Sequence, residues 1–174
     1  SSAILHPMSM ATPGTVYDYD MVTRDRVFRK QTEVLGGFQQ AEYETRRIFA
    51  PSRDGVQVPI SLVYRKGTAL DGSSPLLLYG YGSYGACMEA GFQQERISLL
   101  DRGVIWAIAH IRGGMEMGRG WYEDGKLLKK KNTFRDFIDC AEYLIQEGYT
   151  QANRLIARGG SAGGMLMGAV TNMR

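Results

Sequence analysis

Cysteine and histidine are scarce in this chain, with two residues of each among 174. Cys87 and Cys140 form no CxxC pair and are too few for a disulfide framework, so we expect a reducing compartment and place the protein in the cytoplasm. His6 and His110 stand apart from each other and from both cysteines, and this spacing offers no metal site. We therefore expect no metal and no other cofactor.

Long apolar runs and a strong charge imbalance are also missing. No run of about 18 apolar residues exists, so no segment is expected to span a membrane. Residues 1–7 lack the basic and apolar regions of a secretion signal. Lys and Arg number 21 against 18 Asp and Glu, and a net charge of +3 is far too small to indicate a nucleic-acid-binding surface. The hydrophobic fraction of 44% and the charged fraction of 22% exclude disordered and collagen-like chains.

Glycine is abundant, at 22 residues, and marks turns in a first third that we expect to be β-structure. Residues 16–21 and 27–31 are rich in strand-forming side chains and flank a polar turn, which predicts a hairpin. Residues 32–45 contain two consecutive glycines and little periodicity, so we interpret them as a linker. Asp-Gly at positions 54–55 lies between two apolar runs and predicts a second hairpin, because glycine accepts a positive φ.

From residue 75 the pattern changes to alternating strands and helices. A helix is expected to open at Thr133, with Asp136 three residues on as in a capping box, and to end at Gly148. The long loop before it carries four lysines between 126 and 131, which we interpret as solvated rather than phosphate-binding. The alternation implies right-handed crossovers and a mostly parallel sheet. The other expected elements are strands at 75–79, 104–109 and 155–157 and helices at 92–102 and 165–173.

The strongest chemical motif is Gly-Gly-Ser-Ala-Gly-Gly at residues 159–164. It matches G-x-S-x-G between an expected strand and an expected helix, which is the setting of a nucleophile elbow. Such a sharp turn strains the serine backbone, so small neighbours must flank it. Ser161 is therefore the candidate nucleophile, and the N–H of Ala162, at a helix N-terminus, is a candidate oxyanion donor. The alternative is a flexible glycine-rich loop with no chemistry.

A second glycine motif follows the strand expected at 75–79. Gly80, Gly82 and Gly85 fit the G-x-G-x-x-G pattern of dinucleotide-binding loops. We reject that interpretation, because residues 86–91 precede the next helix and the next strand ends without a carboxylate to hold a ribose. A loop that faces Ser161 across the sheet edge fits better, and the phenol of Tyr81 is then a second candidate oxyanion donor. Alternatively, Tyr81 only packs on the loop.

The partners of a catalytic triad do not follow Ser161 in this chain. The α/β-hydrolase order places an Asp or Glu and then a His after the serine, and residues 162–174 contain none of these. His110 closes an expected buried strand and is interpreted as structural rather than as a relocated base. The chain stops inside an apolar helix pattern without a C-cap. We therefore expect a piece of a longer protein that is inactive on its own.

Four motifs together resemble the prolyl oligopeptidase family of serine peptidases, and the alanine after the serine resembles its oligopeptidase B branch. The resemblance implies that residues 1–45 are the end of a β-propeller domain and a linker. Residues 46–174 would be the N-terminal part of an α/β-hydrolase catalytic domain. Ser161 matches the family nucleophile, and Tyr81 and Ala162 match its oxyanion hole. The motifs are residues 78–85, 110–114, 118–122 and 159–164, with further likeness to the branch at 166–170.

The resemblance also implies an activity for the parent protein. It would be a cytosolic serine endopeptidase that cuts short basic peptides after Arg or Lys through an acyl-enzyme, with no nucleic acid or membrane as partner. Its catalytic Asp and His, and the carboxylates that select basic side chains, would lie beyond Arg174. Two alternatives stay open. One is another serine hydrolase of this fold, such as an acylaminoacyl- or dipeptidyl-peptidase or an esterase, and the other is a non-catalytic α/β module for binding.

Overall fold

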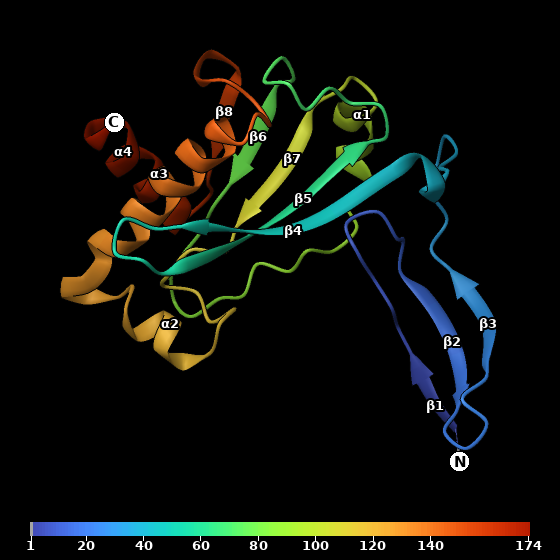
Figure 1. Cartoon of the computed structure of the whole chain (residues 1–174). Coiled ribbons are helices and arrows are strands. Elements are labelled where there is room, and N and C mark those ends of the chain that lie inside the picture. Colours follow the sequence, from blue (N-terminus) through green and yellow to red (C-terminus); the bar gives the residue numbers. More distant parts are fainter. Residues whose placement is uncertain (1) are drawn as a thin grey trace.

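The computed structural model describes residues 2–174 and contains two β-sheets (Figure 1). The first is antiparallel, with β1 (Ser2–Leu5), β2 (Thr15–Asp20) and β3 (Arg26–Gln31) in that order. Its last two strands are the hairpin predicted around residues 16–31. Among its strand residues only Thr15 is buried, so this sheet has no hydrophobic core of its own.

The second sheet has five strands in the order β4-β5-β7-β6-β8. Its hairpin of β4 (Tyr43–Pro51) and β5 (Gln57–Arg65) confirms the turn predicted at Asp-Gly, where Gly55 has a φ of 85°. β4 begins at Tyr43, which is buried, so its first residues lie within the segment at 32–45.

The prediction of a mostly parallel sheet is wrong for half of the strand pairs. Parallel pairing is confined to β7 (Ile105–Ala109), β6 (Leu76–Tyr79) and β8 (Leu155–Arg158). The β4–β5 and β5–β7 pairs are antiparallel, because the hairpin returns β5 alongside β7 in the opposite direction. The parallel half brings the carboxyl ends of β6 and β8 together, and both glycine motifs begin at those ends.

The helices differ from the sequence-based prediction mainly in where they begin. The helix expected at 92–102 is reduced to a short turn and α1, because Gln93 is extended and the Phe92 ring packs on Phe38. The charged loop at 111–132 contains α2. The helices are α1 (Ile97–Leu100), α2 (Arg119–Glu123), α3 (Lys130–Gln146) and α4 (Ala162–Met173), and 3-10 turns lie at Gln40–Glu42, Gln94–Arg96, Leu127–Lys129 and Ala152–Arg154.

The cap predicted for the longest helix is wrong at its start and right at its end. Since α3 opens at Lys130, Thr133 lies inside the first turn and is buried. Its hydroxyl donates to the carbonyl oxygens of Arg112 and Gly125, at 2.6 and 3.1 Å, rather than capping the helix. Gly148 follows the helix with a φ of 78°, as expected of a C-terminal glycine.

Two hydrophobic clusters hold the five-stranded sheet between its neighbours. On one face, α3 and α4 contribute Phe137 and Leu166 to a core shared with Leu78. The other face packs against α1 and against Met10 from the loop after β1. Alternate residues of β6 therefore enter different cores, which fixes the strand end from which the second glycine motif emerges. Within residues 2–174 no helix is both long and apolar enough to cross a membrane.

Candidate active site

Ser161 occupies a sharp turn between β8 and α4. Its φ of 55° and ψ of −121° lie in a region that non-glycine residues rarely adopt. The side chain is exposed, and the next residue, Ala162, is the first of α4. The backbone N–H of Ala162 is thus one of those that a helix start leaves without an intrahelical acceptor. Strand, strained serine and helix follow one another in the predicted order.

Two of the glycines around Ser161, Gly159 and Gly163, are required by close packing of the turn, whereas Gly160 and Gly164 have open space where a Cβ atom would lie. A Cβ atom at Gly159 would overlap the carbonyl oxygen of Gly163. A Cβ atom at Gly163 would lie 3.0 Å from the carbonyl oxygen of Gly80 and 3.8 Å from Cδ2 of the Tyr81 ring. The two glycine motifs therefore meet at this point, and the N–H of Gly80 also donates to the carbonyl of Arg158 at 3.1 Å.

Tyr81 lies two residues after the end of β6 and is half-buried. Its ring faces Gly163 in the first turn of α4, so the structure brings the tyrosine to the elbow that carries Ser161. Gly82 continues the chain with a φ of 64°, a conformation that glycine adopts without strain. The sequence-predicted site residues thus lie at one sheet edge, Tyr81 on the loop after β6 and Ser161 and Ala162 where the chain turns into α4.

Residues with strained backbone conformations cluster near this edge of the sheet. Among residues 2–174 four non-glycine residues have a positive φ, and Ser161, Tyr84 and Leu127 are three of them. Tyr84 and Leu127 line a cavity of about 310 Å³ that also reaches Ala162. Strained residues of this kind persist where the surrounding structure imposes them, and they cluster at functional sites. The full lining is Ser83, Tyr84, Gly113, Tyr122, Gly125, Lys126, Leu127, Lys130, Ala162 and Met165.

A buried ion-pair network holds the chain segment after β7 that packs against the loop of Tyr81. Arg112 and Asp136 have side chains that are 5% and 0% exposed, and they are joined by hydrogen bonds of 2.6 and 2.8 Å. Asp54, in the β4–β5 turn, accepts a further bond of 2.7 Å from Arg112, which holds the pKa of that carboxyl below its ordinary value. The network fixes the chain after β7, where Gly113 sits so close to the carbonyl of Gly82 that a Cβ atom would overlap it.

The interpretation of the lysine cluster as solvated is wrong for Lys130. Its ammonium donates hydrogen bonds to the carbonyl oxygen of Gly82 and to the hydroxyl of Ser83, the latter at 2.9 Å. Burial lowers the pKa of this ammonium. Lys126 and Lys129 instead pair with acidic neighbours in the α2–α3 segment. Sequence spacing gave no sign of the Lys130 contact, because its partners lie far away along the chain.

His110 has the structural role that the sequence indicated. It is 2% exposed, and its Nε2 lies 2.8 Å from the hydroxyl of Ser61 in β5. Its Nδ1 is 3.5 Å from Glu116, so a serine, a histidine and a carboxylate stand in a row inside the protein. Ser61 is only 4% exposed, which excludes this row as a reaction site for peptides. No group of three or more His, Cys, Asp or Glu side chains in the described part of the chain could hold a metal ion.

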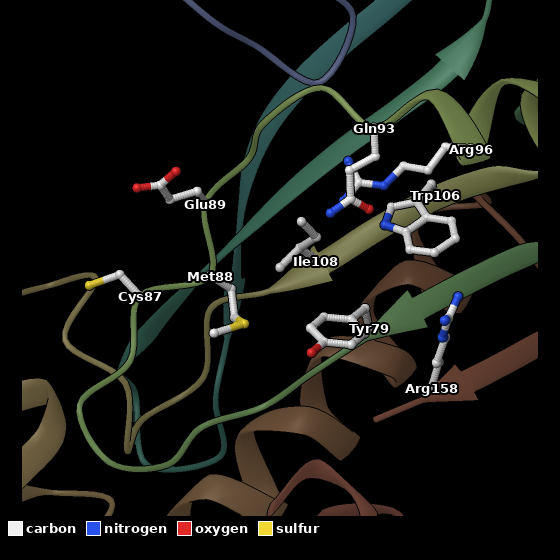
Figure 2. Close-up of a pocket in the computed structure, with 9 residues that line it drawn as sticks. All are labelled: Tyr79, Cys87, Met88, Glu89, Gln93, Arg96, Trp106, Ile108 and Arg158. Atoms are coloured by element: carbon white, nitrogen blue, oxygen red, sulfur yellow. The ribbon is translucent and has the colours of Figure 1, made fainter. Parts of the chain in front are cut away.

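A larger cavity of about 510 Å³ lies elsewhere on the five-stranded sheet (Figure 2). Trp106 of β7 stands between two guanidinium groups, with Arg96 at 4.8 Å and Arg158 at 5.7 Å from the ring centre. Tyr79 and Ile108 complete its sheet side, and none of the predicted site residues lines it. Its volume does not single it out, because cavities of about 520 and 650 Å³ also lie on the protein. Ala162, the residue after the strained serine, lines the smaller cavity of about 310 Å³ instead.

Comparison with known proteins gives a consistent result. Residues 90–174 match the model of the prolyl oligopeptidase family. The chain is 55% identical over 166 residues to dipeptidyl aminopeptidase BI of Pseudoxanthomonas mexicana, a match that covers 95% of this chain and 23% of that protein. It is 44% identical over 165 residues to Protease 2 of Moraxella lacunata, covering 95% of this chain and 24% of that protein.

A solved structure agrees with these matches. Oligopeptidase B from Trypanosoma brucei, in a closed form with covalently bound antipain, superposes with a TM-score of 0.91 at 51% sequence identity. The superposition covers 100% of this chain and 25% of that one. The chain therefore spans about a quarter of the length of the relatives that it matches.

Proposed function

Because the chain belongs to the prolyl oligopeptidase family, we propose that the protein containing it is a serine peptidase with Ser161 as its nucleophile. One observation carries the proposal. Ser161 is held exposed at a φ of 55° on a strand-to-helix turn, beside the first N–H of α4 and the loop of Tyr81. That geometry is costly for a serine, and a nucleophile elbow accounts for it.

The proposed reaction follows from the positions of these groups. The Ser161 hydroxyl attacks the peptide carbonyl, and its proton passes to a general base outside the 174 residues. The N–H of Ala162 and the phenol of Tyr81 donate hydrogen bonds to the carbonyl oxygen as it becomes an oxyanion. The base then protonates the amine of the leaving peptide. Water hydrolyses the resulting acyl-enzyme and restores the serine.

The substrate class of the proposal is a short peptide cut after Arg or Lys. It is supported by 51% identity to an oligopeptidase B and by the alanine after the proposed nucleophile. A second candidate is removal of dipeptides from a free N-terminus. It is favoured by the 55% identity to a protein named dipeptidyl aminopeptidase BI. Both candidates use the same nucleophile and oxyanion donors.

The arrangement of the rest of the protein is part of the same proposal. We assign residues 1–45 to the end of a β-propeller domain and a linker, and residues 46–174 to the first part of the catalytic domain. The absence of a separate core in the β1–β3 sheet supports this assignment, since such a sheet needs further protein to cover it. A location in the cytoplasm fits the two unpaired cysteines, Cys87 and Cys140.

The test uses the whole protein and a fluorophosphonate probe, which forms a covalent bond with activated serines. Labelling and peptide hydrolysis are expected in the natural protein and are expected to vanish in Ser161→Ala. Ser98→Ala is the matched control, because Ser98 is an exposed serine in α1 outside the site. Hydrolysis that persists undiminished in Ser161→Ala would overturn the proposed function.

A further inference from the structure

We infer that Lys130 is a positioning residue that holds the loop at residues 80–83 so that the Tyr81 phenol meets the oxyanion. The inference rests on the proposed function of Ser161 and Tyr81. Lys130 is the first residue of α3, and its side chain reaches the loop from that helix start. Its ammonium donates to the carbonyl of Gly82 and the hydroxyl of Ser83, the two residues directly after Tyr81.

The loop needs an external support because its own backbone is permissive. It contains Gly80 and Gly82, and Gly82 has a φ of 64°. Glycine lacks a Cβ and loses more conformational freedom on folding than any other residue, so the loop backbone by itself does not fix the direction in which Tyr81 points. A hydrogen bond to the Gly82 carbonyl holds the peptide unit between Gly82 and Ser83, one residue beyond Tyr81. The lysine therefore acts on the tyrosine through the backbone and without contact to its ring.

The charge of Lys130 is used for this contact and not for an ion pair. In the described residues no carboxylate oxygen lies within 4.0 Å of its ammonium, whereas Lys126 and Lys129 have acidic partners at 2.6 Å. Burying an ammonium is costly unless polar groups compensate it, and here the compensation is the loop. Charged donors form stronger hydrogen bonds than neutral ones, so the loop is held firmly.

Other contacts also join α3 to this loop, so loss of the Lys130 ammonium is expected to change the position of the loop without lowering the stability of the protein. The Thr133 methyl and Ile111 fill the space beside Gly82, and the Arg112–Asp136 pair holds the neighbouring chain. Removing the Lys130 ammonium therefore leaves the packing in place and frees only the loop. Lys130 also lines the cavity that reaches Ala162, so a shift of the loop is felt at both oxyanion donors.

The first experiment compares three variants of the whole protein on a hydrolysed reporter peptide. Lys130→Met keeps the length of the side chain and removes the donors, and we expect kcat to fall by about tenfold or more with KM changed less than about threefold. Lys130→Arg retains charge and donors and is expected to recover a large part of kcat. Lys131→Met is the control, because Lys131 is the exposed neighbour. Equal kcat values for the Lys130→Met and Lys131→Met variants overturn the inference.

The second experiment is a double-mutant cycle with Tyr81→Phe. If Lys130 acts through the phenol, Lys130→Met costs less than about twofold once the phenol is gone. The same fold loss in both backgrounds shows a role that does not pass through Tyr81, and it overturns the inference while leaving the serine peptidase intact. Thermal unfolding is measured in parallel. A Lys130→Met protein that unfolds well below the Lys131→Met protein would mean a structural role and also overturn the inference.

Discussion

At the scale of single residues, the site depends on one strained serine and on the small residues that permit its conformation. A non-glycine residue held in such a backbone region costs on the order of 1–3 kcal/mol, which the surrounding structure must offset. Ser161 is exposed, so its own side chain contributes little to that offset. The stabilisation comes from the close packing of Gly159 on Gly163 and of Gly163 on Gly80. The conformation of Ser161 is therefore fixed by its neighbours rather than by its own side chain.

The role of the phenol can be tested by removing a single oxygen atom. Tyr81→Phe in the whole protein is expected to lower kcat by about 10²-fold with a much smaller change in KM, because the phenol bonds the oxyanion more strongly than the substrate carbonyl. Steady-state kinetics on a dibasic reporter peptide measure both constants. Tyr19→Phe, in β2, is the control. A loss below about threefold, under 1 kcal/mol, would assign Tyr81 a packing role only.

Sequence reasoning could identify the residues whose signal is local. The placement of Ser161 and Ala162 on a strand-to-helix turn was predictable because the motif is contiguous, and that of Tyr81 because it follows a buried strand at the same sheet edge. Lys130 and the pair Arg112–Asp136 were not predictable. Their partners lie 48 and 24 residues away in sequence, and only the folded arrangement of α3 against the loops that follow β6 and β7 brings them together.

At the scale of elements, the turn at Ser161 requires the end of β8 and the start of α4 to pack closely, with Gly159 against Gly163. The sequence indicated both elements and the order in which they occur. It misplaced the start of α3, because Thr133 has the chemistry of a helix cap and is used instead to bond two loop carbonyls. Tertiary hydrogen bonds thus overrode a local capping preference. The same competition explains the shortened α1, where an aromatic contact holds Phe92 outside the helix.

The spacing of these elements predicts opposite effects of two glycine substitutions. Gly159→Ala places a Cβ atom on the Gly163 carbonyl, and we expect the displaced turn to lower kcat/KM by about 10²-fold. Gly168→Ala lies in α4 with open space around it, so activity should stay unchanged and helix stability should rise by up to about 1 kcal/mol. Kinetics and thermal unfolding of both variants give the answer. Full activity of the Gly159→Ala protein would contradict the close-packed elbow.

At the scale of the whole molecule, the chain joins two different sheets. The β1–β3 sheet has no hydrophobic core of its own, whereas the five-stranded sheet has a hydrophobic cluster on each face. The five-stranded sheet is covered on one face by α3 and α4 and on the other by α1 and the loop after β1 (Figure 1). The sequence predicted the change from β to α/β along the chain. It overestimated parallel pairing, because strand order depends on long-range contacts that periodicity does not encode. Ser161, the proposed nucleophile, lies at the parallel half, where the start of α4 meets the ends of β6 and β8.

Substrate choice is also a property of the whole molecule, since one residue beside the nucleophile does not build a specificity pocket. We expect the complete protein to cleave after Arg or Lys with a kcat/KM at least about 10²-fold higher than after Pro or Ala. The reason is that the carboxylates expected in its specificity pocket would stay buried and unpaired beside a neutral side chain, which is costly. Matched reporter peptides with blocked N-termini are compared by kcat/KM, together with one that has a free N-terminus two residues before the cut. A preference for the free N-terminus would favour the dipeptidyl-peptidase alternative. A higher kcat/KM for the Pro or Ala peptide would exclude the oligopeptidase B branch, while Ser161 would remain the nucleophile of a serine peptidase.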